Sequence, residues 1–195
     1  MKDDLENINF DEVFLSIFAS QEGLTREEYL IRKTERECIK YEASKVMNLS
    51  PNKWPKLYFN WDLRQKNQRL SFDNIDSLED LNHYYPEGFL AFKAELKEVD
   101  NYLNSYSKRT LEDLWEVGYP DKLAQIIVYL SNKDNSISPP VIIINEAGIT
   151  LKGGNHRYTA AKFSFQKYIT MYTTQNYKSE LNKLLKTIEW LSIKL

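Results

Sequence analysis

Two adjacent glycines, Gly153 and Gly154, stand where a strand pattern gives way to a helix pattern, and no other feature constrains the fold as much. Before them lie two short apolar stretches separated by a turn sequence rich in Asn and Gly. After them, the sequence has the small and apolar residues of a packed helix. We therefore expect strands over about 140–145 and 149–152, followed by a helix over about 155–164.

The residues at this junction favour binding of an anion. Glycines let a backbone approach a phosphate, and the N–H groups of a helix start point outward without intrahelical acceptors. Arg157 can add a two-pronged hydrogen bond and His156 a single donor. Asn155 is a favoured helix N-cap and is expected to act as one. The pattern predicts a phosphorylated ligand, most simply a nucleotide, although a tight turn with a surface arginine has the same sequence.

The junction resembles the active-site loop of the ParB/sulfiredoxin superfamily. That loop reads Gly-Gly-Cys-His-Arg in sulfiredoxins, and here Gly153 to Arg157 read Gly-Gly-Asn-His-Arg. The resemblance extends to a helix that begins near Lys122, to a Pro139-Pro140 entry into a strand, and to a last strand over about 168–173. It covers about residues 107–195, with order and spacing in agreement.

The resemblance implies a nucleotide-binding site, with ATP or CTP as ligand and room for a Mg²⁺ ion brought by the nucleotide. The residues that it assigns to nucleotide binding are Lys122, Gly153, Gly154, Asn155, His156 and Arg157. Asn155 occupies the position of the reactive sulfiredoxin cysteine and has no thiolate to offer. The only cysteine, Cys38, lies far upstream in a charged segment. Reduction of a sulfinic acid is therefore not expected.

Three functions are compatible with these residues. The first is a nucleoside-triphosphate phosphohydrolase of the ParB/sulfiredoxin-like type, and the second is a ParB-like nuclease that acts on DNA. The third is a non-catalytic module, switched by nucleotide or bound to a protein partner, as in plasmid, phage or defence systems. Catalysis needs a group that activates the nucleophile, and four carboxylates lie near the site in sequence, namely Glu112, Asp113, Asp134 and Glu146. The sequence does not choose among them.

The chain is expected to be an α+β protein in two parts. Residues 107–195 form the small mixed-sheet ParB/sulfiredoxin-like domain, and residues 1–106 form a helical region that resembles no family. The first part carries 14 basic and 20 acidic residues, and the second carries 12 and 8. A moderately basic second part suits a phosphate ligand and permits contact with DNA. Residues 1–106 are expected to supply packing and a surface for a protein partner.

Periodicity and capping signals place the remaining elements. Apolar residues Phe10, Val13, Phe14, Ile17 and Phe18 mark one helical face, and Thr25 with Glu28 forms a capping box for a helix to about Leu49. A further helix is expected to start at Ser77 to Asp80, and others are expected over 86–106, between Thr110 and Gly118, over 120–131 and over 177–194. The aromatic stretch from Trp54 to Trp61 is expected to be irregular or a short strand, and its side chains are expected to pack or to stack on bases.

Composition excludes several classes of protein. No run of about 18 apolar residues is present, and the acidic start of the chain has no apolar signal core, so a secreted or membrane-spanning protein is not expected. A single cysteine excludes an internal disulfide and suits the cytoplasm. Only His83 accompanies His156, and no group of residues has metal-ligand spacing. We therefore expect no bound metal beyond one that a nucleotide brings.

Overall fold

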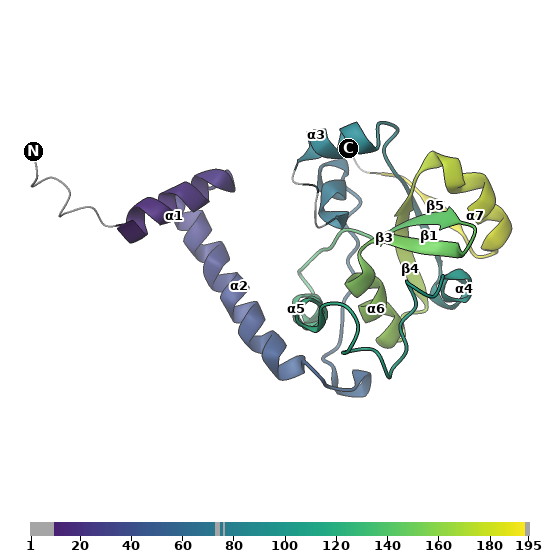
Figure 1. Ribbon diagram of the computed structural model, residues 1–195, viewed down its shortest axis with the longest axis horizontal. Coiled ribbons are helices and arrows are strands. Elements are labelled where there is room, and N and C mark those ends of the chain that lie inside the picture. The colour runs from purple at the N-terminus through teal and green to yellow at the C-terminus, as the bar shows by residue number, and fades with distance from the viewer. Residues whose placement is uncertain (1–9, 73–74, 76, 194–195) are drawn as a thin grey trace, which may run out of the picture.

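The computed structural model describes residues 10–72, 75 and 77–193 of the chain. It confirms the α+β class, because helices surround one five-stranded mixed sheet. An arm of two helices, α1 (Phe10–Gln21) and α2 (Arg26–Val46), extends from the sheet-containing body (Figure 1). Among the described helices, none combines the length and the apolar character needed to cross a bilayer.

The sheet has the strand order β3-β2-β4-β1-β5. Its strands are β1 (Leu90–Glu95), β2 (Val141–Asn145), β3 (Gly148–Gly153), β4 (Tyr168–Thr173) and β5 (Glu189–Leu191). Hairpin β2–β3 and the pairs β1–β4 and β1–β5 are antiparallel, whereas β2 and β4 are parallel. The expected hairpin and the expected strand at 168–173 are confirmed, and a register shift interrupts the hairpin at Val141 and Ile142.

Strand β1 corrects the expectation of a helix over 86–106. Residues Leu90–Glu95 pair along their whole length with β4, and only Leu96–Tyr102 form a helix, α4. The apolar spacing of Phe89, Phe92 and Leu96 fits a helix, but Phe92 and Ala94 also share one face of a strand. Pairing with β4 over all six residues decides in favour of the strand. The sheet thus takes strands from both sides of residue 106.

The end of the chain corrects the expectation of one helix over 177–194. Helix α7 (Lys178–Leu184) follows a 3-10 turn, η3 (Gln175–Tyr177), and stops before β5. The carboxylate of Glu98 accepts hydrogen bonds from the backbone N–H groups of Lys186 and Thr187, at 2.7 and 3.0 Å. These bonds hold the chain in an extended turn, which directs the following residues to the edge of the sheet.

The segment from Thr110 to Gly118 forms turns rather than the expected short helix. Thr110 and Asp113 do exchange the two hydrogen bonds of a helix start, from Thr110 N–H to the carboxylate and from Asp113 N–H to the hydroxyl. Gly118 has a φ of +86°, a left-handed conformation that ends helices. Too few residues lie between these two signals for a helix to propagate.

Three apolar clusters hold the body together. The largest lies between one face of the sheet and helices α4, α6 (Asn155–Phe163) and α7, and it includes Phe92, Ile142 and Met171. A second joins α5 (Pro120–Ser131) to α6 and to Leu57. The third covers the other sheet face near α3 (Leu78–Tyr84) and contains Tyr172. Burying both faces of a small sheet in this way requires residues from both halves of the chain.

The other helix signals are confirmed. Thr25 and Glu28 form the capping box of α2, Ser77 caps α3, and α5 spans the expected residues 120–131. Helix α1 begins at Phe10, but the side chains of Phe10 and Val13 lie outside the described part of the chain. The aromatic stretch is irregular, with a 3-10 turn η1 (Pro51–Lys53) before it, and it packs: the Trp54 indole lies edge-on to Trp115 at 6.1 Å.

The backbone carbonyl of Asp62 accepts a hydrogen bond from the hydroxyl of Tyr172 on β4, and the side chain of Asp62 yields a pH prediction. Its carboxylate accepts from Arg64 at 2.9 Å, and this hydrogen bond holds the pKa of Asp62 far below its usual range. A carboxyl group with a lowered folded pKa stabilises the fold above its unfolded pKa of about 3.9, and this contribution is lost as the pH falls further. We expect Asp62→Asn to cost about 1 kcal/mol at pH 7. In urea titrations, the difference from wild type should shrink below about pH 4 and stay constant above about pH 5.

Candidate nucleotide-binding site

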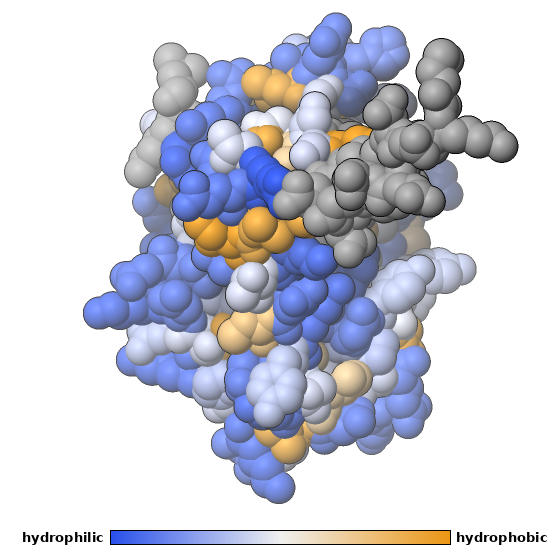
Figure 2. Space-filling view, turned by 90° about the vertical axis from the view of Figure 1, so that its left-hand side faces the viewer, coloured by the Kyte–Doolittle hydropathy of each residue, from blue (hydrophilic) through white to orange (hydrophobic). Residues whose placement is uncertain are grey.

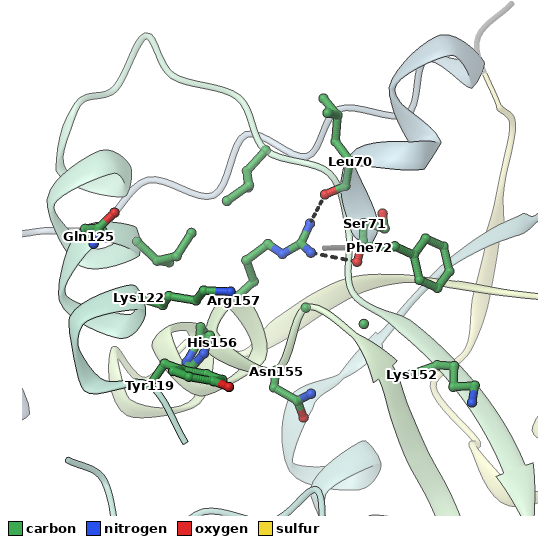
Figure 3. A pocket seen from close by; sticks show the side chains of 14 residues that line it. Leu70, Ser71, Phe72, Tyr119, Lys122, Gln125, Lys152, Asn155, His156 and Arg157 are labelled. Carbon is green, nitrogen blue, oxygen red and sulfur yellow. Dashed lines mark hydrogen bonds between the residues drawn. The ribbon is translucent and has the colours of Figure 1, made fainter. Parts of the chain in front are cut away.

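One cavity of about 550 Å³ brings together all six residues that the sequence assigns to nucleotide binding. It lies where the end of β3 meets the start of α6, between α5 and the 3-10 helix η2 (Gln65–Ser71) (Figure 3). Its lining consists of Leu70, Ser71, Phe72, Tyr119, Lys122, Gln125, Ile126, Ile137, Lys152, Gly153, Gly154, Asn155, His156 and Arg157. This volume is in the range of small-molecule sites, which is about 300–1,000 Å³.

Gly153 is a glycine because another backbone lies against it. A Cβ atom at this position would stand 2.3 Å from the carbonyl oxygen of Ser71. No side chain fits at that distance, so the end of β3 and the end of η2 can touch only through a glycine. From the sequence, this glycine is expected to let the backbone approach a phosphate. The structure gives another reason for a glycine here, which is its close packing against Ser71.

Gly154, and not Asn155, is the N-cap of α6, which corrects the expectation of an asparagine cap. Gly154 has a φ of +79° in the left-handed region, where a Cβ would meet Pro140 Cα at 2.9 Å. Asn155 is instead the first residue of the helix, and its side chain lies at the cavity wall (Figure 3). The turn made by Gly154 aims the start of α6 at the cavity, as an anion site at a helix N-terminus requires.

Arg157 is buried, and its guanidinium group is engaged by the protein. It is 7% exposed and donates to the carbonyl oxygen of Ser138 at 2.7 Å. It also donates to those of Ser71 at 2.9 Å and Leu70 at 3.2 Å (Figure 3). These bonds join α6 to η2 and to the entry of β2. Arg157 therefore contributes positive charge to the cavity wall, and its Nη atoms link the segments that form this wall.

Two lysines make the cavity basic, and His156 adds a hydrogen-bond donor. Lys122 is exposed on α5, with its ammonium group 5.1 Å from the centre of the Tyr119 ring, and in Figure 3 it extends toward Arg157. Lys152 comes from β3 and His156 from the first turn of α6. No Asp or Glu occurs among the fourteen described lining residues. A cavity with cations and no compensating carboxylate in its described lining attracts anions.

The carboxylates considered as general bases lie elsewhere. Glu112, Asp113, Asp134 and Glu146 are absent from the described lining, and Asp113 is engaged by Thr110. Within the described part of the chain, no group of three or more His, Cys, Asp or Glu residues could hold a metal ion.

The body of α6 is fixed by core contacts. Tyr158 is a core residue with 1% exposure, and its hydroxyl donates to Asp100 at 3.1 Å. Burial raises the pKa of Tyr158 well above its usual value, so it stays neutral. Lys162 pairs with the same carboxylate at 2.9 Å. These contacts set the position of the helix start, and hence of the cavity wall.

Sequence reasoning missed the contribution of the first half of the chain. Leu70, Ser71 and Phe72 form one wall of the cavity, although every expected site residue lies beyond residue 106. No motif marks these three residues, because two of them take part through backbone carbonyls. Gln125 on α5 was also missed, and it follows Lys122 by three residues on the same face of the helix.

Comparisons with protein-family models, curated proteins and solved structures found no match to this chain. The function is therefore inferred from the cavity and its residues.

Proposed function

We propose that this protein binds ATP or CTP in the cavity at the start of α6 and acts as a nucleoside-triphosphate phosphohydrolase of the ParB/sulfiredoxin-like type. The observation that supports it most is the convergence of Lys122, the glycine pair and Asn155 to Arg157 on one cavity. Gly153 to Arg157 are consecutive, and the apolar cluster between α5 and α6 brings Lys122 to the same wall. A glycine pair at a helix start, with cations beside it and no carboxylate in the described lining, supports a phosphorylated ligand.

The proposed binding mode follows from the geometry of the wall. The phosphates lie against the first turn of α6, where the helix dipole favours negative charge. Lys122 reaches them from α5 as a point charge, Lys152 adds positive charge from β3, and His156 supplies a hydrogen-bond donor beside Tyr119. The uncharged part of the ligand contacts the apolar side chains Leu70, Ile126 and Ile137. Hydrolysis would then rest on positioning and charge neutralisation.

A second candidate is a non-catalytic nucleotide-binding module, favoured by the lack of a carboxylate in the described lining. With no base and no protein ligand for Mg²⁺ among the described lining residues, a bound triphosphate could persist and act as a switch. We place either function in the cytoplasm, where ATP and CTP are abundant. Turnover of labelled ATP and CTP, with and without DNA, separates the candidates. Phosphate release indicates hydrolysis, DNA cleavage indicates the nuclease alternative, and stable binding indicates the module.

Lys122→Ala should weaken nucleotide binding without changing stability. The side chain is exposed and its charge faces the cavity, so its loss removes one charged hydrogen bond, about 1.5 kcal/mol, or roughly tenfold in Kd. Isothermal titration calorimetry with ATP and with CTP measures this directly. Thermal unfolding without ligand should be that of the wild type.

Lys133 provides a matched control, since it is an exposed lysine just beyond the opposite end of α5. Lys133→Ala should leave nucleotide affinity unchanged. If the wild type binds neither nucleotide, the proposal is wrong. If both lysine variants lose affinity equally, binding reflects overall charge and not this cavity.

A further inference from the structure

Tyr119 lies at the rim of the cavity, and most of its side chain is open to solvent. It is 64% exposed, although it lines the same cavity as the glycine pair. Other apolar and aromatic side chains are exposed on the arm, where Figure 2 shows apolar residues among polar ones, but these do not line the cavity. An exposed ring beside an anion site offers a flat face to an aromatic group of the ligand.

The backbone holds Tyr119 in place. Tyr119 is the N-cap of α5, and its carbonyl oxygen accepts from the N–H groups of Lys122 at 3.0 Å and Leu123 at 3.2 Å. The preceding residue, Gly118, lies close to the ring of His156, since a Cβ atom at Gly118 would stand 3.7 Å from His156 Cε1. The Tyr119 ring thus projects from an anchored helix start, which lowers the entropy cost of stacking a ligand on it.

One face of the Tyr119 ring remains available to a ligand. The ammonium group of Lys122 lies 5.1 Å from the centre of the ring, and Figure 3 shows Lys122 and His156 on the same side of it. The other side of the ring faces away from both side chains, in agreement with the 64% exposure of Tyr119. Every nucleobase has a flat face that stacks on such a ring, so the open side suits a base.

The phosphate site lies between Tyr119 and the apolar end of the cavity. Figure 3 shows Tyr119 and Leu70 at opposite ends of the lining, with His156 and Arg157 between them. In the proposed binding mode, the phosphates lie at the start of α6 and the nucleoside contacts the apolar side chains near Leu70. A mononucleotide bound in this way leaves the Tyr119 ring without an aromatic partner.

We propose that the ligand is a dinucleotide, in which the phosphates carry a second nucleoside whose base stacks on Tyr119. This inference rests on the proposed function, because it takes the phosphates to bind at the start of α6. Two kinds of compound have the required chemistry, namely dinucleoside polyphosphates with phosphoanhydride bridges and short single strands with phosphodiester bridges. The second base adds a stacking contact that ATP lacks, so a dinucleotide should bind about tenfold more tightly than ATP.

Isothermal titration calorimetry of the full-length chain tests this preference with diadenosine tetraphosphate, ATP and inorganic tripolyphosphate. The wild type should bind diadenosine tetraphosphate about tenfold more tightly than ATP. Tyr119→Ala should bring these two affinities together and leave that for tripolyphosphate unchanged, whereas Tyr119→Phe keeps the ring and should keep the preference. Tyr106→Ala is the matched control and should also keep it, because Tyr106 is 85% exposed and is absent from the described lining.

The same titrations separate this inference from the proposed function. If ATP, CTP and tripolyphosphate all fail to bind, the proposed function is wrong and the inference falls with it. If ATP binds and diadenosine tetraphosphate binds no more tightly, only the inference is wrong. The same holds if Tyr119→Ala weakens both equally. The 5′-phosphorylated dinucleotide pApA identifies the bridge: tighter binding of diadenosine tetraphosphate assigns the phosphoanhydride class, and tighter binding of pApA assigns the phosphodiester class.

Discussion

Arg157→Ala is expected to destabilise the fold by about 3–5 kcal/mol, a large share of the roughly 5–15 kcal/mol that holds a domain together. The guanidinium group is 7% exposed and donates to three carbonyl oxygens, those of Leu70, Ser71 and Ser138. Alanine leaves these acceptors without their charged donor and leaves a hole where the side chain was. Urea unfolding followed by circular dichroism measures the loss.

Arg157→Lys separates charge from geometry. Lysine keeps the positive charge but cannot reach three carbonyls with a planar fork, so it should recover only part of the lost stability. The alternative, that Arg157 serves the ligand first, makes a different prediction. In that case Arg157→Ala would keep the unfolding midpoint of the wild type and lose nucleotide affinity alone. That result would return Arg157 to the role that the sequence pattern assigns to it.

Capping residues and apolar periodicity predict correctly those helices whose contacts with the rest of the chain favour the same structure. Helix α5 and the capping box of α2 lie at their predicted positions because caps and periodicity coincide there. The sequence of strand β1 also fits a helix, because Phe92 lies on the apolar face in both the helical and the strand spacing. The pairing of β1 with β4 joins segments some 80 residues apart, so no local pattern predicts it. The end of α7 depends on Glu98, also distant in sequence. Interactions between distant segments decide each difference from the prediction.

The candidate site is predictable in its residues but not in their roles. The six expected residues line one cavity, because a glycine pair at a strand-to-helix junction fixes the local geometry. The sequence cannot show that Arg157 faces carbonyl oxygens of η2, since a carbonyl acceptor has no residue-specific signal. It also cannot show that Gly153 lies against Ser71. Both contacts come from the half of the chain that the sequence pattern leaves for packing and partner binding.

Gly153→Ala is the second substitution with a large expected effect, about 3 kcal/mol of lost stability. The new Cβ would lie 2.3 Å from the Ser71 carbonyl oxygen, which is a backbone atom and cannot turn aside. Either η2 or the end of β3 must move. The same Ser71 carbonyl accepts from Arg157, so a shift of η2 also weakens that hydrogen bond and deforms the cavity. Nucleotide affinity should therefore fall together with the unfolding midpoint.

Gly88 provides the control for the loss of a glycine in itself. It has a φ of +67° with nothing within 4 Å of the place that a Cβ would take, so Gly88→Ala meets only the backbone preference, about 1 kcal/mol. Gly153 has the opposite properties, an ordinary φ and a severe steric contact. Equal losses of stability in the two variants would contradict the steric conflict expected between a Cβ at Gly153 and the Ser71 carbonyl oxygen. A larger loss at Gly153, with nucleotide affinity reduced there and unchanged at Gly88, would establish that the two halves of the chain meet at the cavity wall and hold it in shape.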